Sequence, residues 1–171
     1  MNADFDARFV EVERQNESLA NLYVASYQLH STLEWNEVLG AIAEIVSGLV
    51  GASEYALLLL DDAGTRLDVA AGEGVEERFP TGSTGVEDGL EGAVARSGQS
   101  HFAEEGSETE QVVVVPLMLM KKCVGVIAIY RMLSQKRGAL TSVDHELLNL
   151  LAGQAAAALV SSRLYAHGER T

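Results

Sequence analysis

Apolar side chains recur at helical spacing along the first part of the chain. Residues 5–33 contain neither Gly nor Pro, and a four–three spacing of apolar positions predicts one long helix there. Polar residues interrupt this series at Asn16, Ser26 and His30, so the apolar seam is imperfect. The helix must pack either on its own domain or on a second copy of the chain. In the second case, Asn16 is a candidate for fixing the register of the pair.

A second helix is predicted directly after the first. Asn36 is a suitable N-cap, and the apolar positions from Val38 to Leu49 follow the 3.6-residue period of an amphipathic helix. We expect Gly51 to end this helix, because glycine readily adopts the left-handed conformation that follows a last helical turn.

Two pairs of short apolar runs predict two β-hairpins. The first pair is 55–60 and 66–71, joined by a turn that contains Gly. The second pair is 112–120 and 124–130, separated by a Lys-Lys dipeptide. Pro116 cannot donate a backbone hydrogen bond, so it predicts an edge position or a bulge in the third run.

The segment between the two hairpins, residues 73–110, is called the crossover below. It is rich in Gly, Glu and Ser. The only regular elements predicted in it are a short helix at about 90–97 and a short strand at 100–103. The tetrapeptide Gly-Ser-Thr-Gly at 82–85 is interpreted as a turn.

The last helix is predicted from an N-cap at Thr141 to about Tyr165, and it is apolar on two faces. The first face comprises Val143, Leu147, Leu150, Ala157 and Leu164, and the second comprises Leu148, Leu151, Ala155, Ala158 and Tyr165. A helix that covers a sheet needs only one apolar face. The second face therefore implies a second partner, which is either the N-terminal helix or another subunit.

The order of elements predicts an α+β fold. Strands that cluster in hairpins indicate an antiparallel sheet, here of five to six strands, with helices layered on it. We divide the chain into an N-terminal helix, residues 1–33, which is a possible dimerisation helix, and a domain at 34–168 that closes with the helix at about 141–165.

Composition narrows the classes of partner. The chain has 171 residues, a net charge of −13 and a pI of about 4.6, which disfavours nucleic acid and anionic membranes. The N-terminus has no basic stretch followed by an apolar run, and no apolar run reaches the ~20 residues of a spanning helix. A single cysteine excludes an internal disulfide and a cysteine-based zinc cage. We therefore expect a cytoplasmic protein.

Several short motifs, taken in their order, resemble the GAF family over roughly residues 32–160. The matching segments are Leu33–Leu39 at a helix opening, Val50–Ala52, Ala70–Gly74, Gly89–Val94 followed by Ser97–Gln99, Val115–Leu117, Val124–Ile127, and Leu140–Leu148 followed by Leu151–Ala155. Leu140 stands where an aromatic residue is common in the family. The resemblance implies that the N- and C-terminal helices pack on one face of the sheet and that the crossover, with its short helix, lies on the other.

The resemblance also implies a pocket between the sheet and the crossover, which some members use for cyclic nucleotides, bilins, haem or nitrate. Cyclic-nucleotide members often carry Asn-Lys and Asp-Glu pairs that have no match here. The crossover holds ten Asp or Glu residues against only Arg78 and Arg96. These carboxylates would repel a phosphate, and we interpret them as a solvated loop.

Few residues are candidates for catalysis. Cys123 follows two lysines that would lower its pKa, but a packing role is the favoured interpretation. Reductases of free methionine sulfoxide, which are related through the resemblance, work through several cysteines, and this chain has one. The histidines lie far apart in the sequence, without metal-ligand spacing: His30, His101, His145 and His167. No Gly-x-Ser-x-Gly motif occurs, so we expect no enzyme, no metal and no cofactor.

Two functions remain open. The first is a non-catalytic sensory or regulatory domain that binds a small molecule and signals to a separate protein, as a homodimer through its terminal helices. The second is a dimerising scaffold or protein-interaction module with an empty, vestigial pocket. Candidate pocket residues, most of them equally suited to a core, are Tyr55, Leu58, Thr84, Leu90, Val94, Phe102, Val114, Met118 and Tyr130. Candidate dimer contacts are Phe9, Leu19, Leu22, Leu29, Leu148, Leu151, Ala155 and Ala158.

Overall fold

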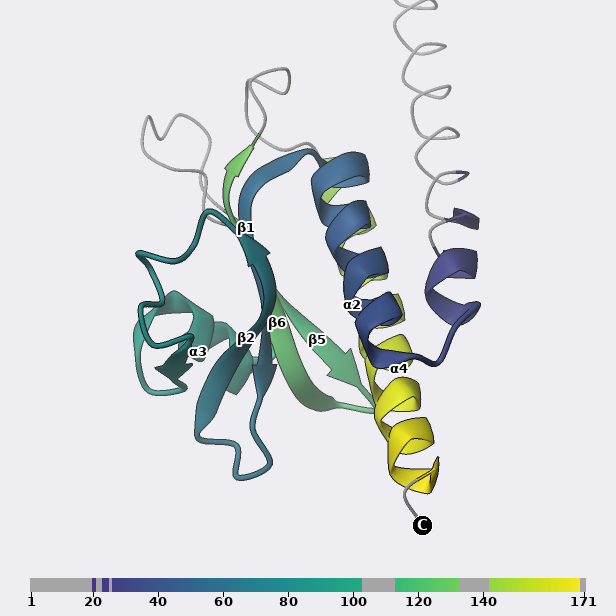
Figure 1. Ribbon diagram of the computed structural model, residues 1–171. Helices are drawn as coiled ribbons and strands as arrows, with labels where there is room; N and C mark the ends of the chain where they lie inside the picture. Colours follow the sequence, from purple (N-terminus) through teal and green to yellow (C-terminus); the bar gives the residue numbers. More distant parts are fainter. Residues whose placement is uncertain (1–19, 21–22, 25, 103–112, 133–141, 170–171) are drawn as a thin grey trace, which may run out of the picture.

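Six strands form one antiparallel sheet in the order β3-β2-β1-β6-β5-β4. The structure is a computed structural model that describes residues 20, 23–24, 26–102, 113–132 and 142–169 (Figure 1). The strands are β1 (Ala52–Leu60), β2 (Arg66–Glu73), β3 (Ser83–Gly85), β4 (His101–Phe102), β5 (Val113–Leu119) and β6 (Lys122–Met132). The helices are α2 (Trp35–Glu44), its π-helical continuation η1 (Ile45–Val50), α3 (Gly89–Ser97) and α4 (Ser142–Glu169).

Helices α2 and α4 cover one face of the sheet, and α3 covers the other (Figure 1). Alternate side chains of the central strand β1 point to opposite faces, because the side-chain period of a strand is two residues. Leu57 and Leu59 pack on the α2 and α4 side, whereas Ala56 and Leu58 pack on the α3 side. The predicted α+β fold and its layers are confirmed.

Each face has its own buried cluster. The α4-side cluster consists of Leu29, Val38, Ile42, Ile45, Val46, Ala52, Tyr55, Leu57, Leu59, Val113, Val115, Leu117, Ile127, Ile129, Leu147, Leu148, Leu151, Ala152, Ala155, Ala156, Ala158 and Leu159. The α3-side cluster consists of Ala56, Leu58, Leu67, Val75, Phe79, Val86, Val94, Ala95, Val114, Val126, Ala128 and Tyr130.

The end of the N-terminal helix packs on the protein's own domain. Among the described residues it is helical at 20, 23–24 and 26–30, and a bend at Ser31 ends it earlier than predicted. Leu29 is 1% exposed and belongs to the α4-side cluster. The rest of the predicted helix, including Asn16, lies outside the described residues.

The N-cap of α2 differs from the prediction. Glu34, not Asn36, is the cap: its carboxylate accepts hydrogen bonds from the backbone nitrogens of Asn36 at 3.3 Å and Glu37 at 2.9 Å. The chain is extended at Glu34, with φ −77° and ψ 125°, which aims this side chain at the free N–H groups of the first turn. Gly51 ends the helical segment at φ 86°, as predicted.

The second hairpin turns one residue earlier than the Lys-Lys pair suggested. Met120 and Lys121 form the turn with positive φ values of 51° and 67°. Pro116 pairs with Val126 of β6, whereas β4 pairs only with Val113 and Val114. Pro116 therefore lies beyond the stretch of β5 that is paired on both edges, in agreement with the predicted edge position.

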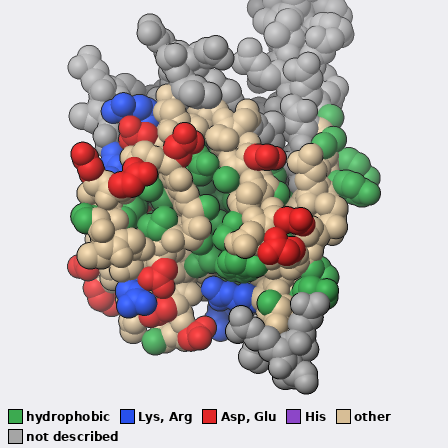
Figure 2. All heavy atoms as spheres, in the orientation of Figure 1, with side chains coloured by type: hydrophobic (Ala, Val, Ile, Leu, Met, Phe, Trp, Pro, Cys, Tyr) green, Lys and Arg blue, Asp and Glu red, His purple; other side chains and the backbone are tan. Residues whose placement is uncertain are grey.

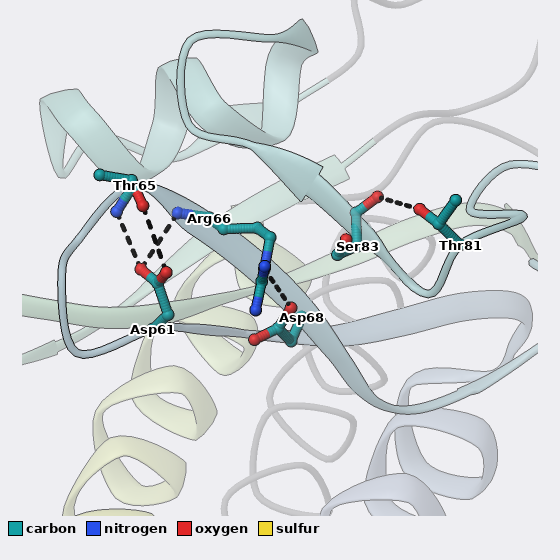
Figure 3. Close-up of polar contacts among 6 residues, drawn as sticks. All are labelled: Asp61, Thr65, Arg66, Asp68, Thr81 and Ser83. Atoms are coloured by element: carbon teal, nitrogen blue, oxygen red, sulfur yellow. Dashed lines mark hydrogen bonds and ion pairs between the residues drawn. The ribbon is translucent and has the colours of Figure 1, made fainter.

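The tetrapeptide at 82–85 is not a turn, so that prediction is wrong. Residues Ser83–Gly85 form β3, which pairs with Arg66–Asp68 at the edge of β2. Figure 3 shows the polar contacts here: the Asp61 carboxylate accepts from the backbone nitrogens of Thr65 and Arg66, and Arg66 bonds to Asp68 at 2.9 Å. A three-residue strand has too little alternation to be seen in the sequence, and its pairing with β2 creates it.

Helix α4 is longer than predicted and continues to Glu169, while the predicted cap Thr141 lies outside the described residues. By length and composition alone, its segment His145–Ala166 could cross a membrane, but half of that apolar window is buried inside the fold. Burial of this kind is typical of a core helix.

Candidate functional site

The candidate site lies on the α3 face of the sheet, under α3 and the crossover residues before it. Helix α3 packs closely against the backbone of Val86 because Gly92 has no side chain. A Cβ atom at this position would lie 2.3 Å from the backbone oxygen of Val86. Glycine is therefore required for α3 to pack at this depth.

Polar side chains meet at one point of the otherwise apolar α3-side cluster. The Tyr130 hydroxyl of β6 donates a hydrogen bond to Glu91 Oε1 of α3 at 2.5 Å. The Arg78 guanidinium lies 4.1 Å from the centre of the Tyr130 ring, within cation–π distance. Tyr130 is 2% exposed, and Arg78 is exposed. We call Arg78, Glu91 and Tyr130 the polar triad.

A short turn of the crossover positions the exposed member of the triad. The backbone nitrogens of Arg78 and Phe79 both donate to the Val75 oxygen at 3.1 Å. This turn buries Phe79, whose ring centre lies 6.4 Å from that of Tyr130 at a tilt of 52°. The Tyr130 ring is thus held between a cation, an aromatic ring and a carboxylate, a setting that can bind a small molecule through both polar and apolar contacts.

Most of the predicted pocket residues reach this face. Leu58, Val94, Val114 and Tyr130 belong to the α3-side cluster, and Leu90 packs against it. The Met118 side chain lies beside Gly98, directly after the last residue of α3. Thr84 lies on β3 and is half-buried.

Two predicted pocket residues, Tyr55 and Phe102, lie on the opposite face. Tyr55 belongs to the α4-side cluster, where burial raises the pKa of its hydroxyl and the charge of Glu73 adds to the effect. The Phe102 ring stacks on His145 of α4 at 3.8 Å. The alternation of a strand shows that neighbours point to opposite faces, but not which face carries which layer, so these two assignments are corrected.

The prediction missed Arg78, Phe79 and Glu91. The acidic residues of the crossover were interpreted together as a solvated loop, which concealed the half-buried Glu91. The usable signal was local: Glu91 lies on a predicted helix three residues before Val94, and positions three apart share a helix face.

Cys123 packs against the α3-side cluster and is half-buried. Burial raises the pKa of its thiol, even though two lysines precede it, and the thiol lies 3.2 Å from the Gly125 backbone oxygen. The lysines are exposed and do not reverse the effect of burial. This arrangement agrees with a packing role. In the part of the chain that the structure describes, no three His, Cys, Asp or Glu residues are grouped to hold a metal ion.

The predicted dimer contacts that the structure describes lie in the protein's own core. Leu29, Leu148, Leu151, Ala155 and Ala158 are at most 3% exposed within the single chain. Their side chains therefore have no surface left for a second copy in this arrangement. Phe9, Leu19 and Leu22 lie outside the described residues.

The exposed apolar side chains of the terminal helices lie elsewhere. Tyr23, Val24 and Tyr27 are 77%, 55% and 73% exposed. Figure 2 shows hydrophobic side chains protruding from the N-terminal helix on the side away from the sheet. Leu150 and Leu164 of α4 are 49% and 69% exposed and belong to the first apolar face predicted for that helix.

Comparisons with solved structures agree with this architecture. The GAF domain of a phosphoenolpyruvate-protein phosphotransferase from Acinetobacter matches with a TM-score of 0.72 and 19% identity, covering 90% of this chain and 96% of that one. The corresponding domain from Coxiella burnetii matches with a TM-score of 0.73 and 14% identity, covering 90% and 98%. The free methionine-R-sulfoxide reductase from Neisseria meningitidis, solved with its substrate, matches with a TM-score of 0.69 and 18% identity. The match covers 89% of this chain and 93% of that one.

At these identities the neighbours establish the fold and not the activity. The comparison with curated proteins gives no match. The family model described as GAF domain matches residues 34–160, from the N-cap of α2 into the last part of α4. The chain therefore belongs to the GAF domain family, a family of regulatory and sensory domains.

Proposed function

We propose that this protein is a non-catalytic sensory domain that binds a small molecule on the α3 face and signals to a separate protein. The polar triad is the observation that carries the proposal. Burying polar groups is costly unless they are paired, so a plain core has little use for a Tyr–Glu hydrogen bond beneath an arginine. Such a group serves a ligand that replaces part of the pairing.

The triad indicates the chemistry of the ligand. Arg78 offers donors to an anionic or carbonyl group, and Glu91 and Tyr130 offer partners to a donor. The Phe79 ring and the neighbouring aliphatic side chains suit an apolar body. We infer a small molecule with one polar end that carries both donors and acceptors.

The proposal assigns no catalytic step. Its support is the single cysteine with a raised thiol pKa and the position of the histidines. Among the described histidines, His30 and His145 contact residues on the α4 side of the sheet, away from the triad. The similarity to a reductase lies in the fold, and that comparison leaves the chemistry of this chain open.

We also propose a homodimer through the terminal helices, with contacts that differ from those that the sequence predicts. Its seam would use Tyr23, Val24 and Tyr27 of the N-terminal helix and Leu150 and Leu164 of α4. Exposed apolar side chains along helices favour pairing with another surface of the same kind.

A scaffold without a ligand is the second candidate, and one observation favours it. Phe79 and Val86 are each 9% exposed and Val94 is 3% exposed, so the protein's own side chains fill the site as it stands. Ligand entry would require the crossover to move away from the sheet.

Native mass spectrometry of the purified full chain tests both candidates. A retained small molecule that is lost in Arg78→Ala and Glu91→Ala supports the sensory function. Arg66→Ala is the matched control, because Arg66 is also exposed but bonds to Asp68 on β2, away from the triad. A dimer without any ligand would support the scaffold, and a ligand-free monomer would contradict both.

A further inference from the structure

We propose that the short connection from α3 to β4 is a coupling strut that transmits changes at the polar triad to α4 and from there to the N-terminal helix. The strut is defined by Ser100 and Phe102 and by their contacts with Asn149 and His145 of α4. The inference rests on the proposed function only in taking the triad as the place where a ligand acts.

Two side-chain contacts fasten the strut to α4. The Phe102 ring stacks on the His145 ring, with centroids 3.8 Å apart and an angle of 22° between planes. The Ser100 hydroxyl donates to Asn149 Oδ1 at 2.9 Å. His145 and Asn149 are four residues apart, so they lie on the same side of α4. The strut therefore grips one face of the helix at two successive turns.

The strut is joined closely to the triad at its other end. Glu91 holds Tyr130 from within α3, and α3 ends at Ser97, with the Gly98 nitrogen bonded to the Val94 oxygen at 2.8 Å. Only Gly98 and Gln99 separate the helix from Ser100. A connection of two residues leaves little slack in the backbone, so we expect a shift of α3 to reach Ser100 and Phe102.

The central strands of the sheet are harder to displace than the strut. Strands β1 and β6 pair with each other and each with a further strand, β2 and β5, so moving them would break many backbone hydrogen bonds. Among the described residues, strand β4 pairs with β5 at His101 and Phe102 alone. A change on the α3 face is therefore passed around the β4 edge of the sheet more easily than through it.

Helix α4 carries the output contact further along. Gln154 lies about 7.5 Å beyond Asn149 at roughly 1.5 Å per residue. Its side-chain oxygen accepts from the Ser26 hydroxyl at 3.1 Å and lies 2.8 Å from His30 Nε2. Both residues belong to the N-terminal helix, so one helix contacts the strut and the element with the exposed tyrosines.

Amide hydrogen exchange followed by NMR on the ligand-free full chain tests the strut. Tyr130→Phe removes the hydroxyl that Glu91 accepts from, without adding volume. We expect amides of α3 to exchange roughly tenfold faster or more, the factor that corresponds to one lost hydrogen bond to a charged group. We expect a smaller acceleration at residues 145–154 and 26–30.

The strut is then cut by His145→Ala with Asn149→Ala. In that background, Tyr130→Phe should still accelerate α3 but no longer α4. His145→Phe, which keeps an aromatic ring beside Phe102, should preserve transmission, and Ser161→Ala, an exposed change on α4, should leave it intact. Should the double variant fail to fold, Ser100→Ala alone removes one contact and should weaken the α4 response.

The inference would be overturned if Tyr130→Phe accelerated exchange in α4 equally with and without the strut contacts. It would also be overturned if Tyr130→Phe in the intact chain accelerated exchange in α3 but not in α4. Because the measurement uses no ligand, it is separate from the test of the sensory function. A protein that binds no ligand can still transmit a change from α3 to α4, and a protein that binds a ligand can fail to transmit it.

Discussion

The two faces of the sheet differ in the polar side chains that lie among their buried apolar residues. The one polar side-chain group of the α4-side cluster is the Tyr55 hydroxyl, which bonds to the Ser47 side chain near Glu73, and the buried Ser162 at the margin donates to the Leu33 backbone oxygen at 2.8 Å. The α3-side cluster contains a Tyr–Glu hydrogen bond with an arginine over the ring. The first face has the character of a structural core. The second combines a core with the candidate site, and its covering layer is a crossover with one short helix.

This difference in cover has a consequence for stability and motion. The α4 side is held by long helices, and the α3 side by a nine-residue helix and an irregular chain. Segments with less regular structure open more readily than packed core helices. We therefore expect ligand access on the α3 side, and we expect the α4 side to act as its rigid support.

Truncating the α4 side should give the largest effect. Leu151→Ala removes a fully buried side chain and should lower the free energy of unfolding by about 2–5 kcal/mol. Its control on the same helix is Glu146→Ala, at an exposed position outside the proposed dimer seam, which should change it by less than about 0.5 kcal/mol. Urea unfolding measures both. Equal losses would mean that the Leu151 side chain is not packed in the core.

Adding a side-chain atom where α3 packs against the Val86 backbone should give the next largest change in stability. Gly92→Ala places a Cβ atom 2.3 Å from the Val86 oxygen and should cost about 1–3 kcal/mol, more than the gain in helix propensity. Gly153→Ala on α4, where nothing lies within 4 Å of the new atom, should instead stabilise by about 1 kcal/mol. Thermal unfolding gives the sign of each change. A stabilising Gly92→Ala would show that α3 is loosely held.

Removing one hydroxyl tests the polar character of the α3 face. Tyr130→Phe should lower the free energy of unfolding by about 1.5 kcal/mol, because it removes a hydrogen bond to a carboxylate. Ser161→Ala, which removes an exposed hydroxyl on α4 outside the proposed dimer seam, should have no measurable effect. Urea unfolding of the two variants compares a buried and an exposed hydroxyl. If the two losses are equal, the triad makes no contribution to stability.

The smallest effect concerns pH at Cys123. Burial raises the pKa of this thiol above its ordinary value, 9.0, so the folded state retains its proton at a higher pH than the unfolded chain does. This difference in pKa contributes to stability in full at pH values below the thiol pKa of the unfolded chain. The contribution is lost as the pH rises through the thiol pKa of the folded state. Iodoacetamide should modify Cys123 more slowly than a cysteine in a short peptide at pH 8. Cys123→Ala should remove this part of the decline in stability above pH 9, and equal reaction rates would contradict burial as the cause.

The sequence by itself determined the order of the elements, the antiparallel sheet and the amphipathic helices. These follow from local periodicity: a period of two along the strands, a period near 3.6 along the helices, and a glycine at the end of η1. The GAF resemblance, carried by short motifs such as Gly89–Val94, added the layers and the expected position of a pocket. Even the two apolar faces of α4 were visible in the sequence.

Only the tertiary structure decided which of those faces is buried. The face with Leu148 and Leu151 packs on the sheet. The other face is divided, because Leu147 is buried at 7% exposure whereas Leu150 and Leu164 are exposed. A sheet covered on both sides has apolar residues at successive positions, so alternation alone does not distinguish the layer above from the layer below. For the same reason Tyr55 was assigned to the wrong face. The polar triad joins residues from a turn, a helix and a strand, and no local pattern links positions 78, 91 and 130, because their contact arises only when the crossover folds back over the sheet.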